Sequence, residues 1–374
     1  MSKLFESSKI NGMTLANRFV RSATWEGMAA DDGAVTPKLI ETMVNLANGG
    51  VGLIISSHAY ISPEGQASPW QLGIDNDECI DGLQEMTAAV HASGAKIVMQ
   101  LAHAGVYADE HVIGQPPLVV SNFEGQSESP RHEITADDIR MLVAAFSNAA
   151  RRAKSAGFDG VQIHAAHGYL LSQFLSPAFN QRRDEYGGDI TNRSRVIFEV
   201  YQAIRKTVSR TYPVLMKINC RDFIPNGLMP EDSLQVGIIL ANAGLDAIEL
   251  SGGMVMSKPK NSPSRPQINA ENKEAYFKED AVSFKKKISI PLILVGGIRS
   301  FGVAERLVED GFADYISLSR PFIREPKLIN RWKAGDRRKA TCKSDNLCLR
   351  PALNGDGIYC VTERRERAKQ GVPI

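Results

Sequence analysis

The chain has 374 residues, of which 43% are hydrophobic and 23% charged, and its formal net charge at pH 7 is +2. A charge so close to neutral gives no electrostatic basis for binding nucleic acid or an anionic membrane surface. The sequence contains no run of about 18 uncharged apolar residues that could span a bilayer, and its polar N-terminus lacks the apolar segment of a signal peptide. The cysteines form an odd set, which does not fit a secreted disulfide framework, so we expect a cytoplasmic protein. They are Cys79, Cys220, Cys342, Cys348 and Cys360.

The first expected element is a β-hairpin. Lys9-Ile10 and Met13-Thr14-Leu15 flank Asn11-Gly12, a pair that favours a two-residue type I′ turn. Such a hairpin could close the bottom of a barrel.

Short apolar runs then alternate with amphipathic stretches almost to the end of the chain. Several helix starts are recognisable, such as Thr36 before Pro37, and glycines such as Gly157 follow helix ends. The expected strands are residues 17–22, 51–56, 96–101, 160–164, 214–219, 247–250, 292–295 and 315–318, and the clearest helices are residues 37–48, 79–93, 136–156 and 192–208.

This alternation predicts an α/β fold, a closed (β/α)8 TIM barrel with an N-terminal hairpin and a C-terminal tail. A doubly wound sheet is the alternative, but no Gly-x-Gly-x-x-Gly follows the first strand. Long insertions, residues 105–133 and 251–272, follow the third and sixth strands and read as loops at the rim that carries the active site. We expect residues 1–335 to form one barrel domain and residues 336–374 a polar tail that is not a separate domain.

The ends of the last two strands are typical of a phosphate site. Gly296 and Gly297 follow the seventh strand, and Ser319 and Arg320 follow the eighth. Bare glycines let backbone N–H groups approach an anion, and arginine pairs with phosphate bidentately. Two such loops in succession favour phosphate binding over a tight turn and a helix cap.

Two other strands carry polar side chains in apolar surroundings. Gln100 ends the third strand, where an amide can both donate and accept hydrogen bonds to a heterocycle. Lys217 lies within Leu215-Met216-Lys217-Ile218 of the fifth strand, and a buried lysine needs a partner. It could meet an anion at the barrel mouth, form a Schiff base or pair with a neighbouring carboxylate, and the residues alone do not rank these roles.

The most informative segment follows the fourth strand. His164, His167 and Tyr169 lie within six residues, so two imidazoles can donate hydrogen bonds to one oxygen and a phenol can deliver a proton nearby.

These motifs resemble the Old Yellow Enzyme family of FMN-dependent NAD(P)H oxidoreductases, over roughly residues 3–335. The resemblance rests on Asn17-Arg18-Phe19-Val20, on Gln100-Leu101-Ala102-His103-Ala104-Gly105 and, most specifically, on the block from His164 to Arg195. That block contains His164-Ala-Ala-His167-Gly-Tyr169-Leu-Leu, Phe174-Leu-Ser-Pro177 and Asp184-Glu-Tyr186-Gly-Gly188.

The resemblance implies FMN at the C-terminal mouth of the barrel, with NADH or NADPH as the electron donor. Its phosphate would lie on Gly297, Ser319 and Arg320, with Gly296 beside it. Ala23 and Thr24 would contact the isoalloxazine, Gln100 its pyrimidine edge, and Lys217 the N1 and C2 carbonyl region, where charge stabilises the reduced flavin.

The resemblance also implies a ping-pong mechanism with an activated alkene as the second substrate, usually an α,β-unsaturated carbonyl compound. NAD(P)H reduces flavin N5 and leaves, and the alkene then binds over the same face. His164 and His167 would hold the carbonyl oxygen, and Tyr169 would protonate the α-carbon. The family also leads us to expect a homo-oligomer.

Two positions near the site differ from the best-known family members, and we place both on the substrate side with His164 and His167. Trp25 stands where a threonine or cysteine commonly tunes the flavin potential, and an indole cannot make the same contact. His58 replaces a small residue, and it is either a further donor to substrate or a loop histidine turned away from the site.

The tail carries a third difference. Cys342, Asp345, Cys348 and Cys360 resemble a remnant of a Cys-x2-Cys-x2-Cys-x11-Cys iron–sulfur motif found in larger relatives, with an aspartate at the second position. We favour a decayed motif without metal over a cluster or a zinc ion at these residues.

The leading hypothesis is therefore an ene-reductase acting on small activated alkenes. The alternative is a subunit of an electron-transfer system, related to dienoyl-CoA reductases or amine-demethylating enzymes, that uses a centre at the tail cysteines. A non-catalytic flavin- or partner-binding barrel would need none of His164, His167 and Tyr169, and a lyase using Lys217 would be colourless. Substrate identity and the choice between NADH and NADPH lie beyond the sequence.

Overall fold

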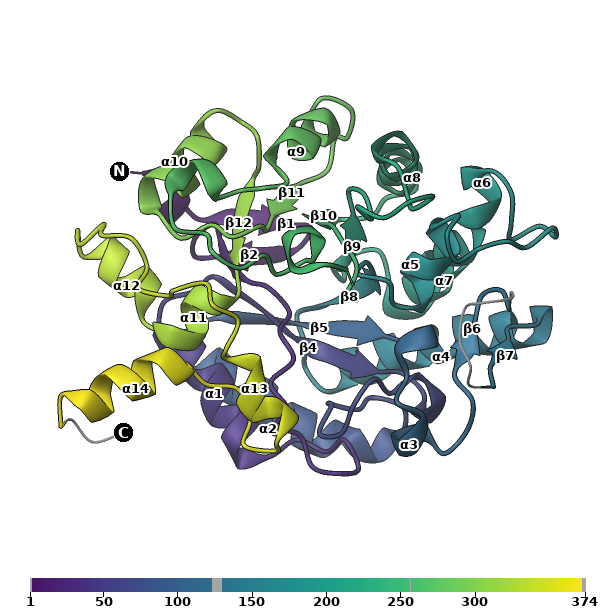
Figure 1. The fold of residues 1–374 in the computed structure, drawn as a ribbon, viewed down its shortest axis with the longest axis horizontal. Coiled ribbons are helices and arrows are strands. Elements are labelled where there is room, and N and C mark those ends of the chain that lie inside the picture. Colours follow the sequence, from purple (N-terminus) through teal and green to yellow (C-terminus); the bar gives the residue numbers. More distant parts are fainter. Residues whose placement is uncertain (1, 123–129, 256, 372–374) are drawn as a thin grey trace.

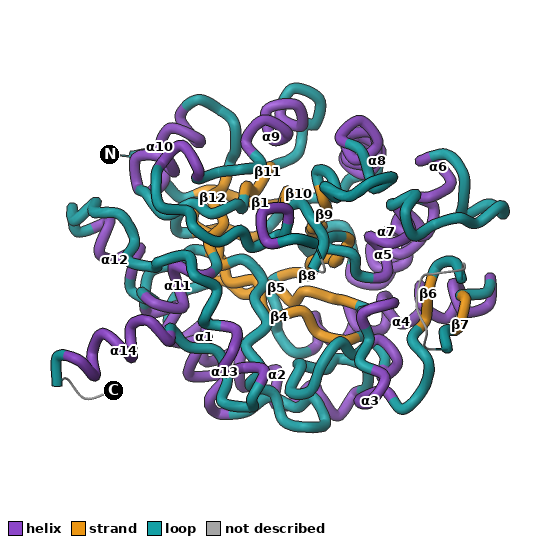
Figure 2. The backbone as a smooth tube through the Cα atoms, in the orientation of Figure 1, coloured by secondary structure: helices purple, strands orange, loops and turns teal. Residues whose placement is uncertain are grey.

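The computed structural model describes residues 2–122, 130–255 and 257–371 and confirms the closed parallel barrel. The strands form a central ring surrounded by helices (Figure 1; Figure 2). Around the ring the strands follow the order β10, β11, β12, β3, β4, β5, β8 and β9. Their bounds are β3 (Phe19–Arg21), β4 (Leu53–Tyr60), β5 (Lys96–Ala102), β8 (Gly160–Ala165), β9 (Val214–Asn219), β10 (Ala247–Ser251), β11 (Leu292–Leu294) and β12 (Tyr315–Leu318).

Every residue of β4, β8, β9 and β10 is buried, because barrel strands pack side chains inward and are covered by helices outside. Helix starts follow capping chemistry: Thr36 accepts from the Leu39 N–H, and Thr135 and Asp138 form a capping box. The helices are α1 (Pro37–Asn48), α2 (Ile80–Ala92), α3 (Glu110–Ile113), α4 (Ala136–Ser155), α5 (Leu170–Leu175), α6 (Ile190–Arg193), α7 (Arg195–Val208), α8 (Pro230–Asn242), α9 (Lys278–Lys285), α10 (Phe301–Glu309), α11 (Arg320–Arg324), α12 (Leu328–Lys333), α13 (Leu349–Leu353) and α14 (Val361–Lys369).

The predicted hairpin is present and closes the floor of the barrel. Strands β1 (Ser8–Ile10) and β2 (Met13–Leu15) pair antiparallel across the turn at Asn11, whose φ is 51°. Ile10, Met13 and Leu15 join a buried cluster with residues at the beginnings of the barrel strands, such as Leu53 and Ala247. Ligands therefore reach the lumen from the opposite rim.

Two local expectations need correction. The helix expected over residues 192–208 is two helices, α6 and α7, separated at Ser194. The insertion over residues 105–133 contains α3 and a small sheet of β6 (Leu118–Val119) and β7 (His132–Glu133), while residues 123–129 lie outside the described part of the chain. Likewise, residue 256 of the second insertion is not described.

The tail is less polar in its packing than its composition indicates. Helices α13 and α14 lie beside α11 and α1, and Cys348, Ala352 and Ile358 join the main hydrophobic core (Figure 1). Across the described residues, no helix is both long and apolar enough to traverse a membrane.

The barrel floor offers a test of the hairpin. Replacing the fully buried Leu15 by alanine should lower the free energy of unfolding by about 2–5 kcal/mol, because it leaves a cavity under the lumen. Thr14→Ala, on the exposed face of the same strand, is the matched control and should change it by less than about 0.5 kcal/mol. If the two substitutions lowered the free energy of unfolding in urea equally, the hairpin would not seal the barrel.

Candidate active site

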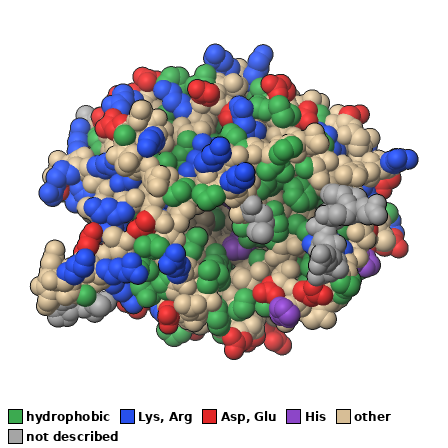
Figure 3. Space-filling view, in the orientation of Figure 1, with side chains coloured by type: hydrophobic (Ala, Val, Ile, Leu, Met, Phe, Trp, Pro, Cys, Tyr) green, Lys and Arg blue, Asp and Glu red, His purple; other side chains and the backbone are tan. Residues whose placement is uncertain are grey.

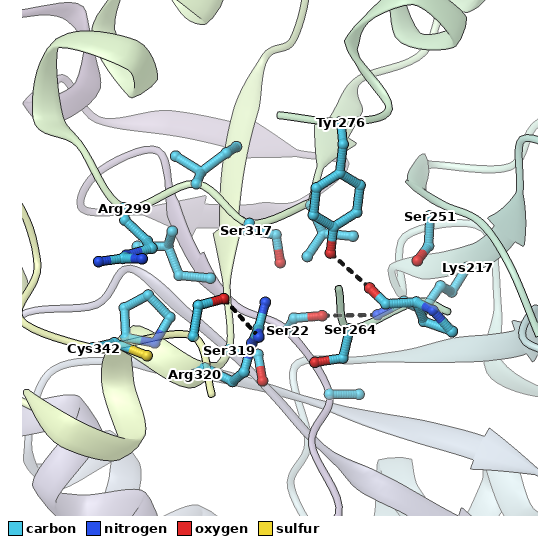
Figure 4. A pocket seen from close by; sticks show the side chains of 18 of the residues that line it. Ser22, Lys217, Ser251, Ser264, Tyr276, Arg299, Ser317, Ser319, Arg320 and Cys342 are labelled. Carbon is cyan, nitrogen blue, oxygen red and sulfur yellow. Dashed lines mark hydrogen bonds between the residues drawn. The ribbon is translucent and has the colours of Figure 1, made fainter. Parts of the chain in front are cut away.

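A pocket opens at the C-terminal ends of the barrel strands, and its volume, open mouth included, is about 640 Å³. The face in Figure 3 is hollowed near its centre, and a histidine side chain is visible inside the hollow. Five predicted cofactor residues line this pocket, together with His167. Figure 4 labels three of the five, Lys217, Ser319 and Arg320. Those five are Ala23, Lys217, Gly297, Ser319 and Arg320.

At the base of the pocket, Lys217 forms a buried ion pair with Glu249. Their strands β9 and β10 are neighbours in register, and the Lys217 Nζ lies 3.2 Å from the Glu249 Oε2. The Nζ also donates to the Ser22 Oγ at 2.7 Å (Figure 4). Of the three roles considered for Lys217, the structure therefore shows the ion pair, on a side chain that also faces the pocket.

Glu249 is satisfied by donors from several strands. Ser22 and Ser317 donate to its Oε1 at 2.7 and 2.8 Å, and the Gln162 amide donates to its Oε2 at 3.0 Å. Burial alone would raise the pKa of Glu249, but Lys217 and these donors lower it overall. For Lys217, burial outweighs the carboxylate, and its pKa falls below the ordinary value.

Gln100 joins this network rather than the pocket wall. Its Nε2 donates to the Gln162 Oε1 at 2.6 Å, and Gln162 in turn reaches Glu249. Gln100 is thus placed two hydrogen bonds from the ion pair, and it is not among the residues that line the pocket.

The other end of the pocket has the features of an anion site. Gly297 has a φ of 73°, and a Cβ on it would lie 2.7 Å from the Tyr276 ring, so the position requires glycine. Arg299 and Arg320 bring two guanidinium groups to this end (Figure 4). Thr24 does not line the pocket, but its hydroxyl lies 2.8 Å from that of Ser319 and supports the wall.

The predicted His164, His167 and Tyr169 are brought together at the end of β8. Ring centroids lie 4.7 Å apart for His164 and Tyr169 and 5.3 Å apart for His164 and His167. The His164 Nδ1 is buried and has no hydrogen-bond partner among the described residues. Of these three residues only His167 is among those that line the described pocket. The unpartnered His164 Nδ1 beside it can still form a hydrogen bond with a ligand oxygen.

His167 is held in a strained backbone conformation, with a φ of 65°. Its N–H donates to the Asn219 Oδ1 at 3.0 Å, its carbonyl accepts from the Val255 N–H at 3.0 Å, and its Nε2 lies 2.8 Å from the Ser251 Oγ. Contacts from the ends of β9 and β10 thus aim the imidazole into the pocket.

The protonation states suit hydrogen-bond donation to a neutral oxygen. Burial, the other histidines and Lys217 hold the pKa of His164 well below its ordinary value, and burial and Lys217 do the same for His167. Burial raises the pKa of Tyr169, and Tyr107 adds to the shift. At neutral pH both imidazoles are therefore uncharged and the phenol keeps its proton.

His58 is not turned away. Strand β4 continues to Tyr60 beyond a register shift between Ile55 and His58, so His58 lies in the strand and not in a loop. Its Nε2 is 3.1 Å from the Tyr169 hydroxyl, and burial lowers the pKa of His58 to about 4. Trp25 packs against the main core, with its indole N–H buried and unpartnered among the described residues.

The tail motif does not assemble a metal site in the described part of the chain, where no group of three or more His, Cys, Asp or Glu side chains could hold an ion. The Asp345 carboxylate instead accepts from the Leu347 N–H at 3.1 Å and bonds the Thr362 hydroxyl. Cys342 and Cys348 are buried, and Cys360 is half-buried as the N-cap of α14.

Sequence reasoning missed Glu249, Arg299 and Tyr276. Glu249 carried the same signal as Lys217, a charge inside an apolar strand, and the expected strand order already placed the two strands side by side. Tyr276 carried no signal of its own, because its role depends on its contact with Gly297.

Comparison with known proteins establishes the class. A model of the NADH:flavin oxidoreductase / NADH oxidase family matches residues 3–339. The chain therefore belongs to this family, the Old Yellow Enzyme family.

Curated relatives fall into two sizes. A Bacillus subtilis NADPH dehydrogenase is 35% identical, with 87% of this chain and 92% of the relative covered. A Thermoanaerobacter brockii NADH oxidase is 35% identical over 99% of this chain but 59% of its own length. A Desulforamulus reducens metal reductase is 36% identical over 90% of this chain and 49% of its length. The chain thus spans about half to three-fifths of these two larger relatives.

Similar solved structures also include both proteins of about this length and larger ones. The Zymomonas mobilis Old Yellow Enzyme homologue superposes with a TM-score of 0.77 at 28% identity, covering 91% of this chain and 96% of its own. A 2-naphthoyl-CoA reductase superposes with a TM-score of 0.88 at 27% identity, covering 96% of this chain and 56% of its own.

The buried imidazoles predict a pH dependence of stability. Between pH 4 and about 6.5 the unfolded chain binds more protons than the folded one, so the free energy of unfolding falls as the pH is lowered through this window. His58 alone accounts for about 3 kcal/mol by pH 4. In urea unfolding of the flavin-free protein, His58→Gln should reduce the slope of the free energy of unfolding against pH. His111→Gln, at an exposed histidine, is the control. An unchanged slope would show that His58 is charged in the folded state.

Proposed function

We propose that the chain binds FMN in this pocket and reduces activated C=C bonds with electrons from NAD(P)H. The pyridine nucleotide and the alkene would bind in turn over the same face of the flavin. The observation that carries the proposal is the arrangement of His164, His167 and Tyr169 beside a pocket with a buried lysine at its base and a Gly297–Arg320 anion site at its end. Binding alone would not require the two imidazoles and the phenol.

The residues present fit FMN. Gly297, Ser319 and Arg320 would hold the phosphate, with Gly296 beside them. As the family resemblance implies, the isoalloxazine ring would be contacted by Ala23, Thr24 and Gln100. Lys217 would place positive charge next to the pyrimidine edge. Bound FMN would supply the chemistry of taking a hydride from a nicotinamide and giving it to an alkene. We propose residues 1–335 as the FMN-binding domain and residues 336–374 as its appendage.

The chain's own contribution is to polarise and protonate the alkene. Neutral His164 and His167 donate to the carbonyl oxygen, which makes the β-carbon electron-poor. Tyr169 keeps its proton at neutral pH and delivers it to the α-carbon. We place His58 and Trp25 on the substrate side, and His58 contacts the same phenol oxygen.

Replacing Tyr169 by phenylalanine tests this assignment. Alkene reduction by the reduced enzyme should slow by about 10²–10⁴-fold, because the proton donor is lost, while flavin reduction by NAD(P)H stays nearly unchanged. Anaerobic stopped-flow absorbance with 2-cyclohexenone as probe measures the two half-reactions separately. Equal losses in both would contradict the role of Tyr169, and an isolated protein that takes up no FMN would contradict the function.

A second candidate is the electron-transfer subunit with a centre at the tail cysteines. The longer match to a 2-naphthoyl-CoA reductase, 96% of this chain against 91% for the smaller Zymomonas homologue, favours it. The side-chain arrangement of Asp345 favours the ene-reductase.

Anaerobic purification distinguishes the two candidates. We expect flavin absorption bands that bleach with NADH or NADPH, and iron and acid-labile sulfide well below one per chain. About four of each per chain, with a broad brown absorption shoulder, would establish the second candidate, since that is the content of a cubane cluster.

A further inference from the structure

The C-terminal tail crosses the phosphate end of the pocket. Cys342 and Ser344 line the pocket together with Arg299 and Arg320, although they follow the last barrel strand by more than twenty residues. Figure 4 labels Cys342 and the two arginines. The tail therefore forms part of the pocket wall, although Cys342 and Ser344 lie beyond residues 3–339, which match the family model.

Three neutral oxygen atoms hold the Arg320 guanidinium. Its Nη1 donates to the Ser344 Oγ at 2.9 Å, to the Asn346 Oδ1 at 2.6 Å and to the Arg265 carbonyl at 2.9 Å. Every hydrogen bond that the described residues make to this side chain uses Nη1, so Nε and Nη2 stay available on the same rigid fork. Because these acceptors are neutral, they hold the guanidinium in place without neutralising its positive charge. That charge stays available to bind an anion.

The tail segment is itself fastened to the loop that follows β10. The Gln267 N–H donates to the Ser344 carbonyl at 2.9 Å, and the Asn346 Nδ2 donates to the Ser264 carbonyl at 2.8 Å. Ser344 and Asn346 have φ values of 57° and 60°, so both adopt the left-handed conformation, and both side chains reach Arg320. The carboxylate between them, Asp345, bonds Thr362 and Leu347 instead.

We propose that Ser344 and Asn346 are positioning residues that hold Arg320 ready for the phosphate monoester of the flavin, so that the tail completes the cofactor site. The inference rests on the proposed function, because it takes FMN as the ligand. An arginine side chain has many rotamers, and fixing it before the ligand arrives removes that ordering cost from the binding step. The tail segment that resembles a decayed metal motif would then hold Arg320, the side chain that binds the phosphate.

Comparing FMN with riboflavin, which lacks the phosphate, isolates this role. The Kd of each flavin is measured by fluorescence titration of the flavin-free protein. For Ser344→Ala/Asn346→Ala we expect the Kd of FMN to rise about tenfold and that of riboflavin to stay within about twofold. Arg320→Ala should show the same selectivity with a larger effect. Asn354→Ala, an exposed asparagine elsewhere in the tail, is the matched control and should change neither.

A second variant keeps the test independent of tail folding. Ser344→Ala alone removes one acceptor from Arg320 but keeps the Ser344 carbonyl and the Asn346 amide, which fasten the tail to residues 264–267, so it should weaken FMN binding selectively. The inference is overturned if the variants bind FMN as tightly as the wild type, or if they lose FMN and riboflavin equally. Failure of the wild type to bind either flavin would instead overturn the proposed function, on which the inference depends.

Discussion

The buried ion pair between Lys217 and Glu249 is the constraint on which the site depends. Two charges inside a barrel are stable only when each has its partner and its remaining hydrogen-bonding positions are filled. Here the partners come from β8, β9, β10 and β12 and from the end of β3, which lie on opposite sides of the lumen. The network therefore crosses the barrel and separates its apolar floor from its polar mouth.

The same lysine also acts on the substrate side of the pocket. Its charge contributes to the lowered pKa of both His164 and His167, after the larger effect of burial. One fixed cation thus helps to keep two imidazoles neutral while it offers positive charge to the base of the pocket. The two halves of the site are electrostatically linked through β8 and β9, where His164 and Lys217 are paired in register.

Much of this architecture could be predicted from local sequence, because strand length, apolar runs and turn residues are local properties. The eight strands, the hairpin at Asn11 and the grouping of His164, His167 and Tyr169 all follow from such signals. What could not be predicted depends on register or on distant contacts. The bulge that brings His58 onto Tyr169 and the tail contacts to residues 264–267 join segments that no periodicity connects.

The left-handed backbone at His167 has a consequence for how the site responds to heating. That conformation is energetically unfavourable for a residue with a Cβ. Hydrogen bonds to Asn219, Ser251 and Val255, at the ends of two strands, maintain it. Chain ends and loops open locally at temperatures where a barrel core stays closed. Once those bonds open, the backbone is free to relax and the imidazole to leave the pocket. We therefore expect the site to lose its geometry on heating before the barrel melts, and to regain it while the barrel below it remains intact.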